Sequence, residues 1–180
     1  MKRPNSLSKS LTAFPETEDD SVRVRIVSSA RQHFLQRGFR SVSMDELAEY
    51  LGMSKRTLYE LFPSKEVLIE AVIGQKFAQI EGELESLTAQ KQLDFPSLAP
   101  QVLACVHRHI SEIQPAFVHD IRRHATELFN LIEKKRRALI ERHVERLISK
   151  GQESGSVRTD LSPGFLVELM LGTVTAMVTP

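Results

Sequence analysis

The sequence predicts an all-α protein in which a small three-helix head precedes a longer helical body. Apolar residues recur every three to four positions through most of the chain, which is the period of an α-helix. Serine, aspartate, glycine and proline stand at the ends of these segments, where they start and stop helices. No segment has the sustained apolar–polar alternation of a strand. We expect a disordered arm over residues 1–20, the head over 21–70 and the body over 71–180.

The predicted arm is polar, contains Pro4 and Pro15, and lacks any periodicity. A segment of this composition buries too little apolar surface to fold, so we interpret it as a solvated tail. Lys2, Arg3 and Lys9 make its first half basic, and a basic arm that reaches a DNA minor groove is the alternative.

The first helix of the head is predicted to run from Ser21 to Gly38. Asp19 and Asp20 precede it, where negative charge favours a helix N-terminus, and a glycine suits its C-terminal end. One face of this helix is apolar and consists of Val22, Ile26, Val27, Ala30, Phe34 and Leu35.

Residues 43–62 read as two short capped helices joined by a glycine turn. Ser43 and Glu46 are spaced as a capping box, in which each side chain bonds the other residue's backbone amide. Gly52 can take the left-handed conformation that ends the first helix, and Ser54 caps the second. Pro63 prevents the second helix from continuing. This helix-turn-helix pattern is typical of proteins that read DNA.

The stretch over residues 26–69 resembles the N-terminal DNA-binding domain of the TetR family of bacterial one-component regulators. The residues that carry the resemblance are Ala30, Phe34, Gly38, Phe39, Leu47, Ala48, Leu51, Gly52, Met53, Ser54, Thr57, Leu58, Tyr59, Phe62, Pro63, Ser64, Lys65, Glu66 and Leu68. The resemblance implies a homodimer whose heads bind operator DNA. It also implies that the helical body binds a small-molecule effector and dimerises.

In a helix-turn-helix the N-terminal part of the second helix enters the major groove, and here that part is 54–59. Lys55 and Arg56 can reach base acceptors or phosphates, and the Tyr59 hydroxyl can bond a phosphate. Ser43 and Lys65 sit at helix N-termini, where the helix dipole favours an anionic phosphate. The predicted DNA contacts are Ser43, Ser54, Lys55, Arg56, Thr57, Tyr59 and Lys65.

The alternative for each of these side chains is a plain surface charge or a helix cap. Two features also depart from the family pattern. Leu61 stands where family members often carry a polar or aromatic phosphate contact. Asp45 and Glu60 bring negative charge near the expected interface, where they would repel phosphates or accept a hydrogen bond from a cytosine amine.

A long helix over 64–87 is predicted to connect the head rigidly to the body. A break follows over residues 88–97, which contain Pro96, and a helix over 98–113 stops before Pro115.

The next helical segment is predicted over 117–150, with a break or kink near His119, and Gly151 and Gly155 end it in a polar turn. The last helix, over 163–178, is apolar nearly all round. Such a helix must be buried in the body or against a second subunit.

Family members usually end in two helices that pair across the dimer, whereas this sequence stops at Pro180, after the first of them. We expect a further helix beyond the sequence given, and the alternative is a smaller dimer interface.

Ligand sites in helical proteins form between helices, so we expect a mostly apolar cavity among the segments 64–87, 98–113 and 117–150. A hydrophobic or amphipathic effector would fit such a cavity. The residues predicted to bind it are Arg108, Phe117, His124, Phe129 and Met170.

Composition limits the other classes of function. The 24 basic residues nearly balance the 23 acidic ones, so any attraction for nucleic acid must be local. The single cysteine, Cys105, and the lack of a long apolar segment predict a soluble cytoplasmic protein that contacts no membrane.

Cys105 and His109 share a helix face but offer only two ligands, and a structural zinc needs four. We therefore expect no metal site, no cofactor and no enzymatic activity, because no catalytic motif is present.

The leading hypothesis is a ligand-responsive transcriptional repressor. Two recognition helices would enter successive major grooves, about 34–36 Å apart, on a near-palindromic double-stranded operator. An effector in the body would favour another spacing of the heads and so weaken operator binding. The alternative is a helix-turn-helix protein that acts mainly through protein partners or nucleoid association.

Overall fold

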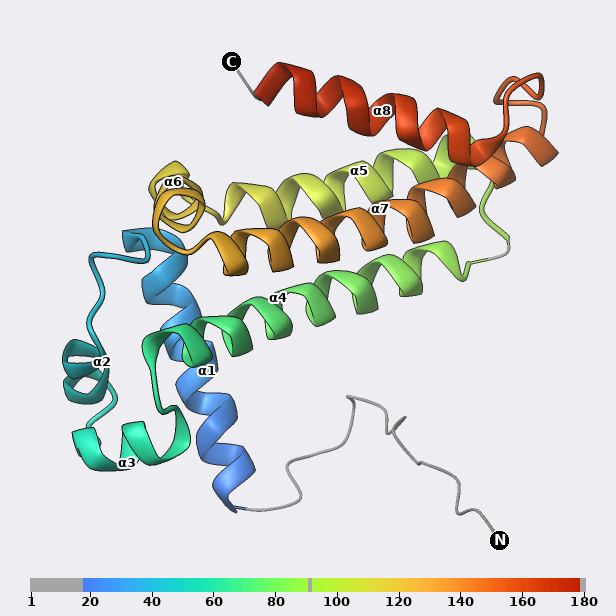
Figure 1. Ribbon diagram of the computed structural model, residues 1–180. Coiled ribbons are helices and arrows are strands. Elements are labelled where there is room, and N and C mark those ends of the chain that lie inside the picture. The colour runs from blue at the N-terminus through green and yellow to red at the C-terminus, as the bar shows by residue number, and fades with distance from the viewer. Residues whose placement is uncertain (1–17, 91, 179–180) are drawn as a thin grey trace, which may run out of the picture.

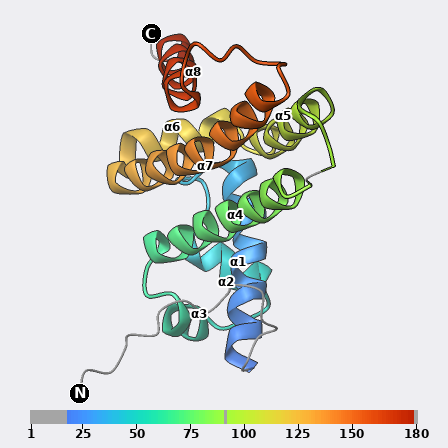
Figure 2. The same ribbon diagram turned by 90° about the vertical axis from the view of Figure 1, so that its right-hand side faces the viewer.

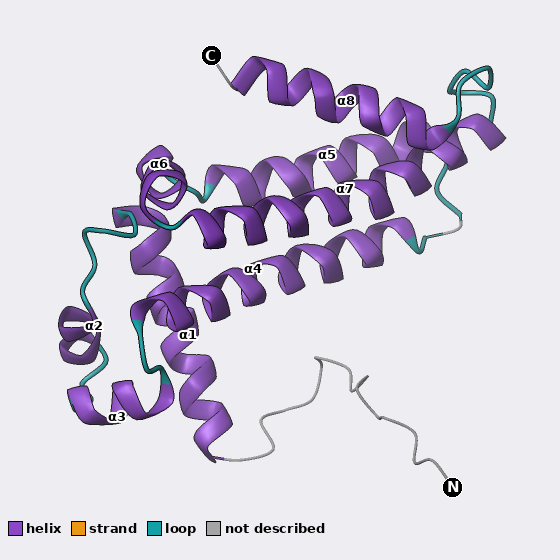
Figure 3. Cartoon of the chain, viewed as in Figure 1, coloured by secondary structure: helices purple, strands orange, loops and turns teal. Residues whose placement is uncertain are grey.

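The computed structural model of the chain describes residues 18–90 and 92–178. These residues form helices joined by short loops and contain no strand, which confirms the predicted all-α class (Figure 3). The helices are α1 (Glu18–Arg37), α2 (Met44–Tyr50), α3 (Lys55–Leu61), α4 (Lys65–Thr88), α5 (Phe95–Ser111), α6 (Pro115–His124), α7 (Thr126–Glu153) and α8 (Pro163–Val178).

The head consists of α1, α2, α3 and the first turns of α4. Its core contains the apolar face predicted for α1, and Ile26, Ala30 and Phe34 have no exposed surface. Leu58 and Phe62 close this core from α3, and both are completely buried. Two helices as short as α2 and α3 depend on this shared core, because isolated helices of their length are not stable in water.

The predicted arm lies outside the described residues except at its end. Glu18 to Asp20 already belong to α1, so this helix begins three residues before the predicted start at Ser21. Acidic residues stabilise a helix N-terminus from inside its first turn as well as from before it, which accounts for the difference.

The body is built on α4, α5 and α7, which lie side by side in both views (Figures 1 and 2). The long α4 begins in the head and runs the length of the body, as predicted, so it connects the two rigidly. Leu84, Leu98, Val102, Cys105 and Leu147 form the core between these three helices.

The short helix α6 joins the body to the head. Phe117 and Ile121 of α6 belong to the same apolar core as the head residues. The Gln114 amide donates to the Leu35 carbonyl at 3.1 Å, and the Arg40 amide donates to the Asp120 carboxylate at 3.1 Å. The head therefore packs on the body, although the boundary near residue 70 stays a prediction.

Three predicted boundaries in the body are wrong by a few residues. The break predicted near His119 falls at Ala125, whose non-helical backbone (φ −143°, ψ 62°) separates α6 from α7. Pro96 lies inside the first turn of α5 instead of in the preceding break, because a helix needs no amide donor there. Ile113 lies beyond the end of α5, since this helix stops at Ser111.

Gly151 was expected to end the long helix, but it lies within α7, which continues to Glu153. A Cβ atom at this position would lie 2.5 Å from Val157 Cγ2 and 2.7 Å from Phe95 Cδ2. The glycine therefore allows Phe95 and Val157 to pack directly on the α7 backbone. Gly155, at φ 72°, makes the turn that was expected of both glycines.

The last helix, α8, crosses α7 at the side of the body away from the head (Figures 1 and 2). Val167 and Leu171 are buried against Ile148 of α7. Among the described helices, none is both long enough and apolar enough to cross a membrane.

Candidate nucleic-acid interface

The first helix of the motif is held by the predicted capping box. The Glu46 amide donates to Ser43 Oγ at 3.1 Å, and the Ser43 amide donates to the Glu46 carboxylate at 2.8 Å. The hydrogen bond from the Ser43 amide, more than any other contact, lowers the pKa of Glu46. A carboxylate thus already occupies the positive end of α2, so a phosphate bound at Ser43 would have to compete with Glu46.

The turn between α2 and α3 has the geometry that its sequence predicts. Gly52 has φ 64°, and the Met53 amide donates to the Ala48 carbonyl at 3.0 Å. Ser54 caps α3, because its Oγ accepts from the Thr57 amide at 3.0 Å. Ser54 Oγ also lies 2.8 Å from Thr57 Oγ1, so both hydroxyls are held at the start of α3.

The outward face of α3 carries the residues predicted to touch DNA. Burial of Leu58 and Phe62 fixes the rotation of the helix about its axis. Lys55 and Arg56 then project into solvent, and Tyr59 is 44% exposed. One exposed face therefore presents two cations and a phenol at a helix N-terminus, which suits a major groove.

Both cations on this face are paired with acids. Lys55 Nζ lies 2.6 Å from the Asp45 carboxylate on α2, and Arg56 Nε lies 2.8 Å from the Glu60 carboxylate one turn along α3. The Asp45 hydrogen bond raises the pKa of Lys55. Exposed ion pairs of this kind are weak, so phosphates or base acceptors can replace the two acids at little cost.

Lys65 is placed differently from the other predicted contacts. It opens α4, as expected, but its ammonium lies 4.4 Å from the centre of the Phe39 ring and 5.9 Å from that of Phe34. Burial lowers the pKa of Lys65. The methylene chain of Lys65 is partly buried and its ammonium lies near two aromatic rings. Lys65 therefore stabilises the head in addition to its predicted contact with DNA.

Arg23 is a residue of the head that sequence reasoning missed. Its guanidinium lies over the Phe62 ring at 4.5 Å and donates to the Leu61 carbonyl at 2.6 Å. These contacts hold the C-terminal end of α3 against α1. No local sequence pattern predicts these contacts, because 38 residues separate Arg23 from Leu61.

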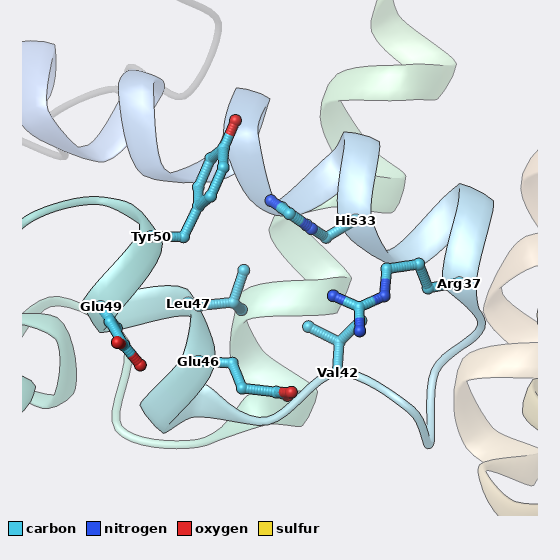
Figure 4. A pocket seen from close by; sticks show the side chains of 7 residues that line it. All are labelled: His33, Arg37, Val42, Glu46, Leu47, Glu49 and Tyr50. Atoms are coloured by element: carbon cyan, nitrogen blue, oxygen red, sulfur yellow. The ribbon is translucent and has the colours of Figure 1, made fainter.

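A shallow pocket lies on the head between α1 and α2 (Figure 4). The His33 and Tyr50 rings meet edge to face in it, with their centres 4.3 Å apart. Arg37 and Glu46 lie on either side of Val42, and the charge of Arg37 further lowers the pKa of Glu46. None of the predicted effector-binding residues lines this pocket.

The structure does not bring the five predicted effector residues into one cavity. Phe117 and Phe129 contribute to the core between head and body. Arg108 is paired with Glu83 on the surface, whereas His124 and Met170 are exposed on different helices. The prediction placed the break near His119 instead of at Ala125, so it put His124 on the same helix as Phe129, although His124 belongs to α6.

Comparison with known proteins agrees with this geometry. Residues 26–72 match the sequence profile described as bacterial regulatory proteins, tetR family. The HTH-type transcriptional regulator UidR of Escherichia coli is 43% identical over 60 residues, which are 33% of this chain and 31% of UidR. The HTH-type transcriptional repressor DhaR of a Mycobacterium species is 22% identical over 153 residues, 83% of this chain and 77% of DhaR.

A solved structure resembles nearly the whole chain. The transcriptional regulator from Cytophaga hutchinsonii superposes with a TM-score of 0.70 at 23% sequence identity. The match covers 86% of this chain and 81% of that protein, so it extends from the head through the body.

Fold and motif together define a DNA-binding transcriptional regulator of the helix-turn-helix class. The head, over residues 26–72, matches the TetR family of bacterial regulatory proteins. Members of this family bind DNA and are not enzymes.

Proposed function

We propose that the chain is a repressor that binds a near-palindromic operator through the outward face of α3. The observation that carries this proposal is the exposed set of Lys55, Arg56 and Tyr59, held opposite the buried Leu58 and Phe62. Lys55 and Arg56 are the base or phosphate contacts, and Tyr59 binds a phosphate.

Ser43, Ser54, Thr57 and Lys65 complete the proposed interface. Ser54 and Thr57 lie at the start of α3, the part of a recognition helix that enters the groove. Ser43 and Lys65 stand at the starts of α2 and α4, where the helix dipole favours a phosphate. At Ser43 the phosphate must displace the Glu46 carboxylate. Thr57 offers its methyl or hydroxyl group to a base, and Ser43, Ser54 and Lys65 position the head along the DNA backbone. Lys55 and Arg56 discriminate between sequences.

Dimerisation through α8 fits a palindromic operator. Phe165 is 54%, Leu169 57% and Met170 49% exposed, whereas Val167 and Leu171 on the other face are buried in the body. An apolar face of this kind on a surface helix suits an interface between two identical subunits. Each subunit then presents one α3 to one half-site.

The proposed repressor is released from its operator by a small-molecule effector. The relative DhaR is named a transcriptional repressor. The long α4 runs from the head through the body, so a small molecule bound among the body helices can change the position of the head. Phe117 and Phe129, at the junction of α6 and α7 with the head, are the predicted effector residues best placed to do so.

Selection of bound fragments from a random pool of duplex DNA tests this function. The proposal expects one near-palindromic consensus, bound with an affinity that falls steeply as salt rises. Binding without any sequence preference would instead favour the alternative function in nucleoid association. A compound that raises the melting temperature should also release the selected DNA, because the coupling between two ligands is reciprocal.

A further inference from the structure

A cluster of three metal-binding side chains lies inside the body, outside the DNA-binding surface. Glu83 of α4 meets Cys105 and His109 of α5, and one ligand atom from each lies within 4.8 Å of the other two. His109 Nε2 is 3.1 Å and Cys105 Sγ is 3.6 Å from the same Glu83 carboxylate oxygen. Cys105 is 4% and His109 2% exposed, so water has little access to these two ligands.

The separations and the chemistry of this cluster suit zinc. Zinc binds thiolate sulfur, imidazole nitrogen and carboxylate oxygen at about 2.0–2.3 Å, so neighbouring ligand atoms in a tetrahedral site lie about 3.3–3.8 Å apart. The two distances to Glu83 lie close to that range. A mixed set of sulfur, nitrogen and oxygen ligands favours zinc over magnesium or calcium, which prefer oxygen alone.

A second buried histidine lies on α7, the third helix of the body. His143 of α7 has no exposed surface, and neither of its ring nitrogens has a hydrogen-bond partner in the described residues. A buried polar group left unpaired is costly, so such a group in a folded protein calls for an explanation. An imidazole nitrogen is also a good zinc ligand.

Contacts on both sides of His143 hold its segment of α7 against α4. Arg142 and Arg146 pair with Glu81 and Glu85 of α4. The His143 ring nitrogens lie outside the group of ligand atoms that are within 4.8 Å of one another, so the ring must turn to join them. Leu147, one turn after His143 on the same face of α7, packs in one core with Cys105 and Leu84. The side-by-side packing of α4, α5 and α7 is visible in Figures 1 and 2.

We propose that Glu83, Cys105 and His109 bind a zinc ion and that His143 turns toward the ion as the fourth ligand. Sequence reasoning stopped at the pair Cys105 and His109, because the fold was needed to add ligands from α4 and α7. The site would join all three helices of the body.

In the metal-free protein two cations hold these ligands in place. Lys76 Nζ is 2.9 Å from His109 Nδ1 and also pairs with Glu112, while Arg108 pairs with Glu83. An ammonium only donates, so His109 Nδ1 accepts and the ring proton is on Nε2, facing Glu83. The cations balance the two carboxylates, and the network is stable without metal.

Zinc binding requires a defined exchange of protons and partners. The Cys105 thiol loses its proton to solvent and ligates as thiolate. The proton of His109 moves from Nε2 to Nδ1, so Lys76 gives up its bond to Nδ1 and keeps Glu112. Arg108 leaves Glu83 for solvent, which its exposed position allows. Lys76 and Arg108 therefore lower the affinity for zinc.

Zinc would regulate DNA binding if the function proposed above holds, since the exchange alters how α4 packs on α5 and α7. The site itself does not depend on that function. Metal binding is therefore measured on the protein alone, and operator release is measured separately.

Titration of the full, untagged, chelator-treated chain with Co²⁺ and then Zn²⁺ tests the site. The proposal expects one Co²⁺ per chain, with the absorption of a tetrahedral centre and a thiolate-to-cobalt charge-transfer band that Zn²⁺ abolishes. Cys105→Ala should lose the charge-transfer band, and Glu83→Gln should weaken binding at least about tenfold. His107→Ala is the matched control, since this exposed histidine lies on α5 between the two ligands.

His143→Leu separates the fourth ligand from the other three. Leucine keeps the site apolar, so the variant should fold, and circular dichroism checks that it does. The cobalt spectrum should shift and zinc affinity should fall about tenfold or more. An unchanged spectrum would remove His143 from the site. Absence of the charge-transfer band in the wild type, or its persistence in Cys105→Ala, would overturn the whole proposal.

Discussion

The Lys55 ammonium of α3 lies 2.6 Å from the Asp45 carboxylate of α2, so an acid from the first helix of the motif holds the first cation of the second. Arg56 is held in the same way by Glu60. In the proposed complex, DNA exchanges these acids for its own acceptors. We therefore expect the two acids to disfavour binding to sequences whose phosphates and bases offer no better partner.

Removing the two acids should strengthen DNA binding. In the double variant Asp45→Asn, Glu60→Gln, the cations are free and two charges that repel phosphates are gone. Each exposed pair is worth up to about 1 kcal/mol, so affinity for unrelated DNA should rise about two- to fivefold per acid. Asp160→Asn is the matched control, because it breaks an exposed ion pair with Arg158 far from the head. Unchanged or weaker binding, measured by anisotropy at low salt, would contradict this role.

The capping box should make the stability of the head depend on pH. The pKa of Glu46 lies below the ordinary value of 4.5 in the folded protein, chiefly because its carboxylate accepts from the Ser43 amide. The ionised group therefore stabilises the fold above the unfolded pKa, and this contribution is lost as pH falls through the folded pKa. Glu46→Ala should be less stable than the wild type at neutral pH, and the difference should shrink in acid.

Urea denaturation at neutral pH and well below pH 4.5 measures this difference. Glu49→Ala, on the same helix but outside the capping box, is the control and should show no such trend. A difference between Glu46→Ala and the wild type that stays constant with pH would show that the carboxylate charge is not responsible.

Two glycine substitutions should have opposite effects. In Gly151→Ala the new Cβ would lie 2.5 Å from Val157 Cγ2 and 2.7 Å from Phe95 Cδ2, so packing must shift. We expect a loss of about 1–3 kcal/mol in the free energy of unfolding. Gly82→Ala meets nothing within 4 Å in the middle of α4, so it should stabilise by up to about 1 kcal/mol. Equal effects in thermal denaturation would show that Gly151 is not needed for close packing.

Charged side chains introduced on the exposed face of α8 test the dimer interface that is proposed there. Phe165→Glu with Leu169→Glu should yield folded monomers, because both side chains lie on the exposed face of the helix. Val167→Glu should instead destabilise the subunit, since Val167 is 1% exposed in the body core. Sedimentation equilibrium distinguishes the outcomes. A double variant that stays dimeric would exclude this face as the interface.

Local sequence signals predicted the head well. Ser43 with Glu46, Gly52 and Ser54 each act within a few residues along the chain, so their caps and turn could be read directly. The apolar face of α1 was equally clear, because a helix repeats its face every turn.

Relationships between distant segments could not be read in this way. The spacing of apolar residues gives the period of a helix but not which neighbour each face meets. Glu83 therefore could not be joined to Cys105, 22 residues away, and the burial of His143 without a hydrogen-bond partner could not be foreseen. For the same reason Phe117 was grouped with Met170, although the fold puts the first in the core and the second on the surface.

DNA binding by the double variant Lys55→Ala, Arg56→Ala tests the central claim most directly. The control is Lys134→Ala with Arg123→Ala, which removes the same charge from exposed positions outside the head. The account predicts that affinity for the selected operator falls about tenfold or more per residue, and that the dependence on salt weakens by about one ion per cation. Stability should stay within about 0.5 kcal/mol of the wild type. Operator affinity equal to that of the control would contradict the assignment of α3 as the recognition helix.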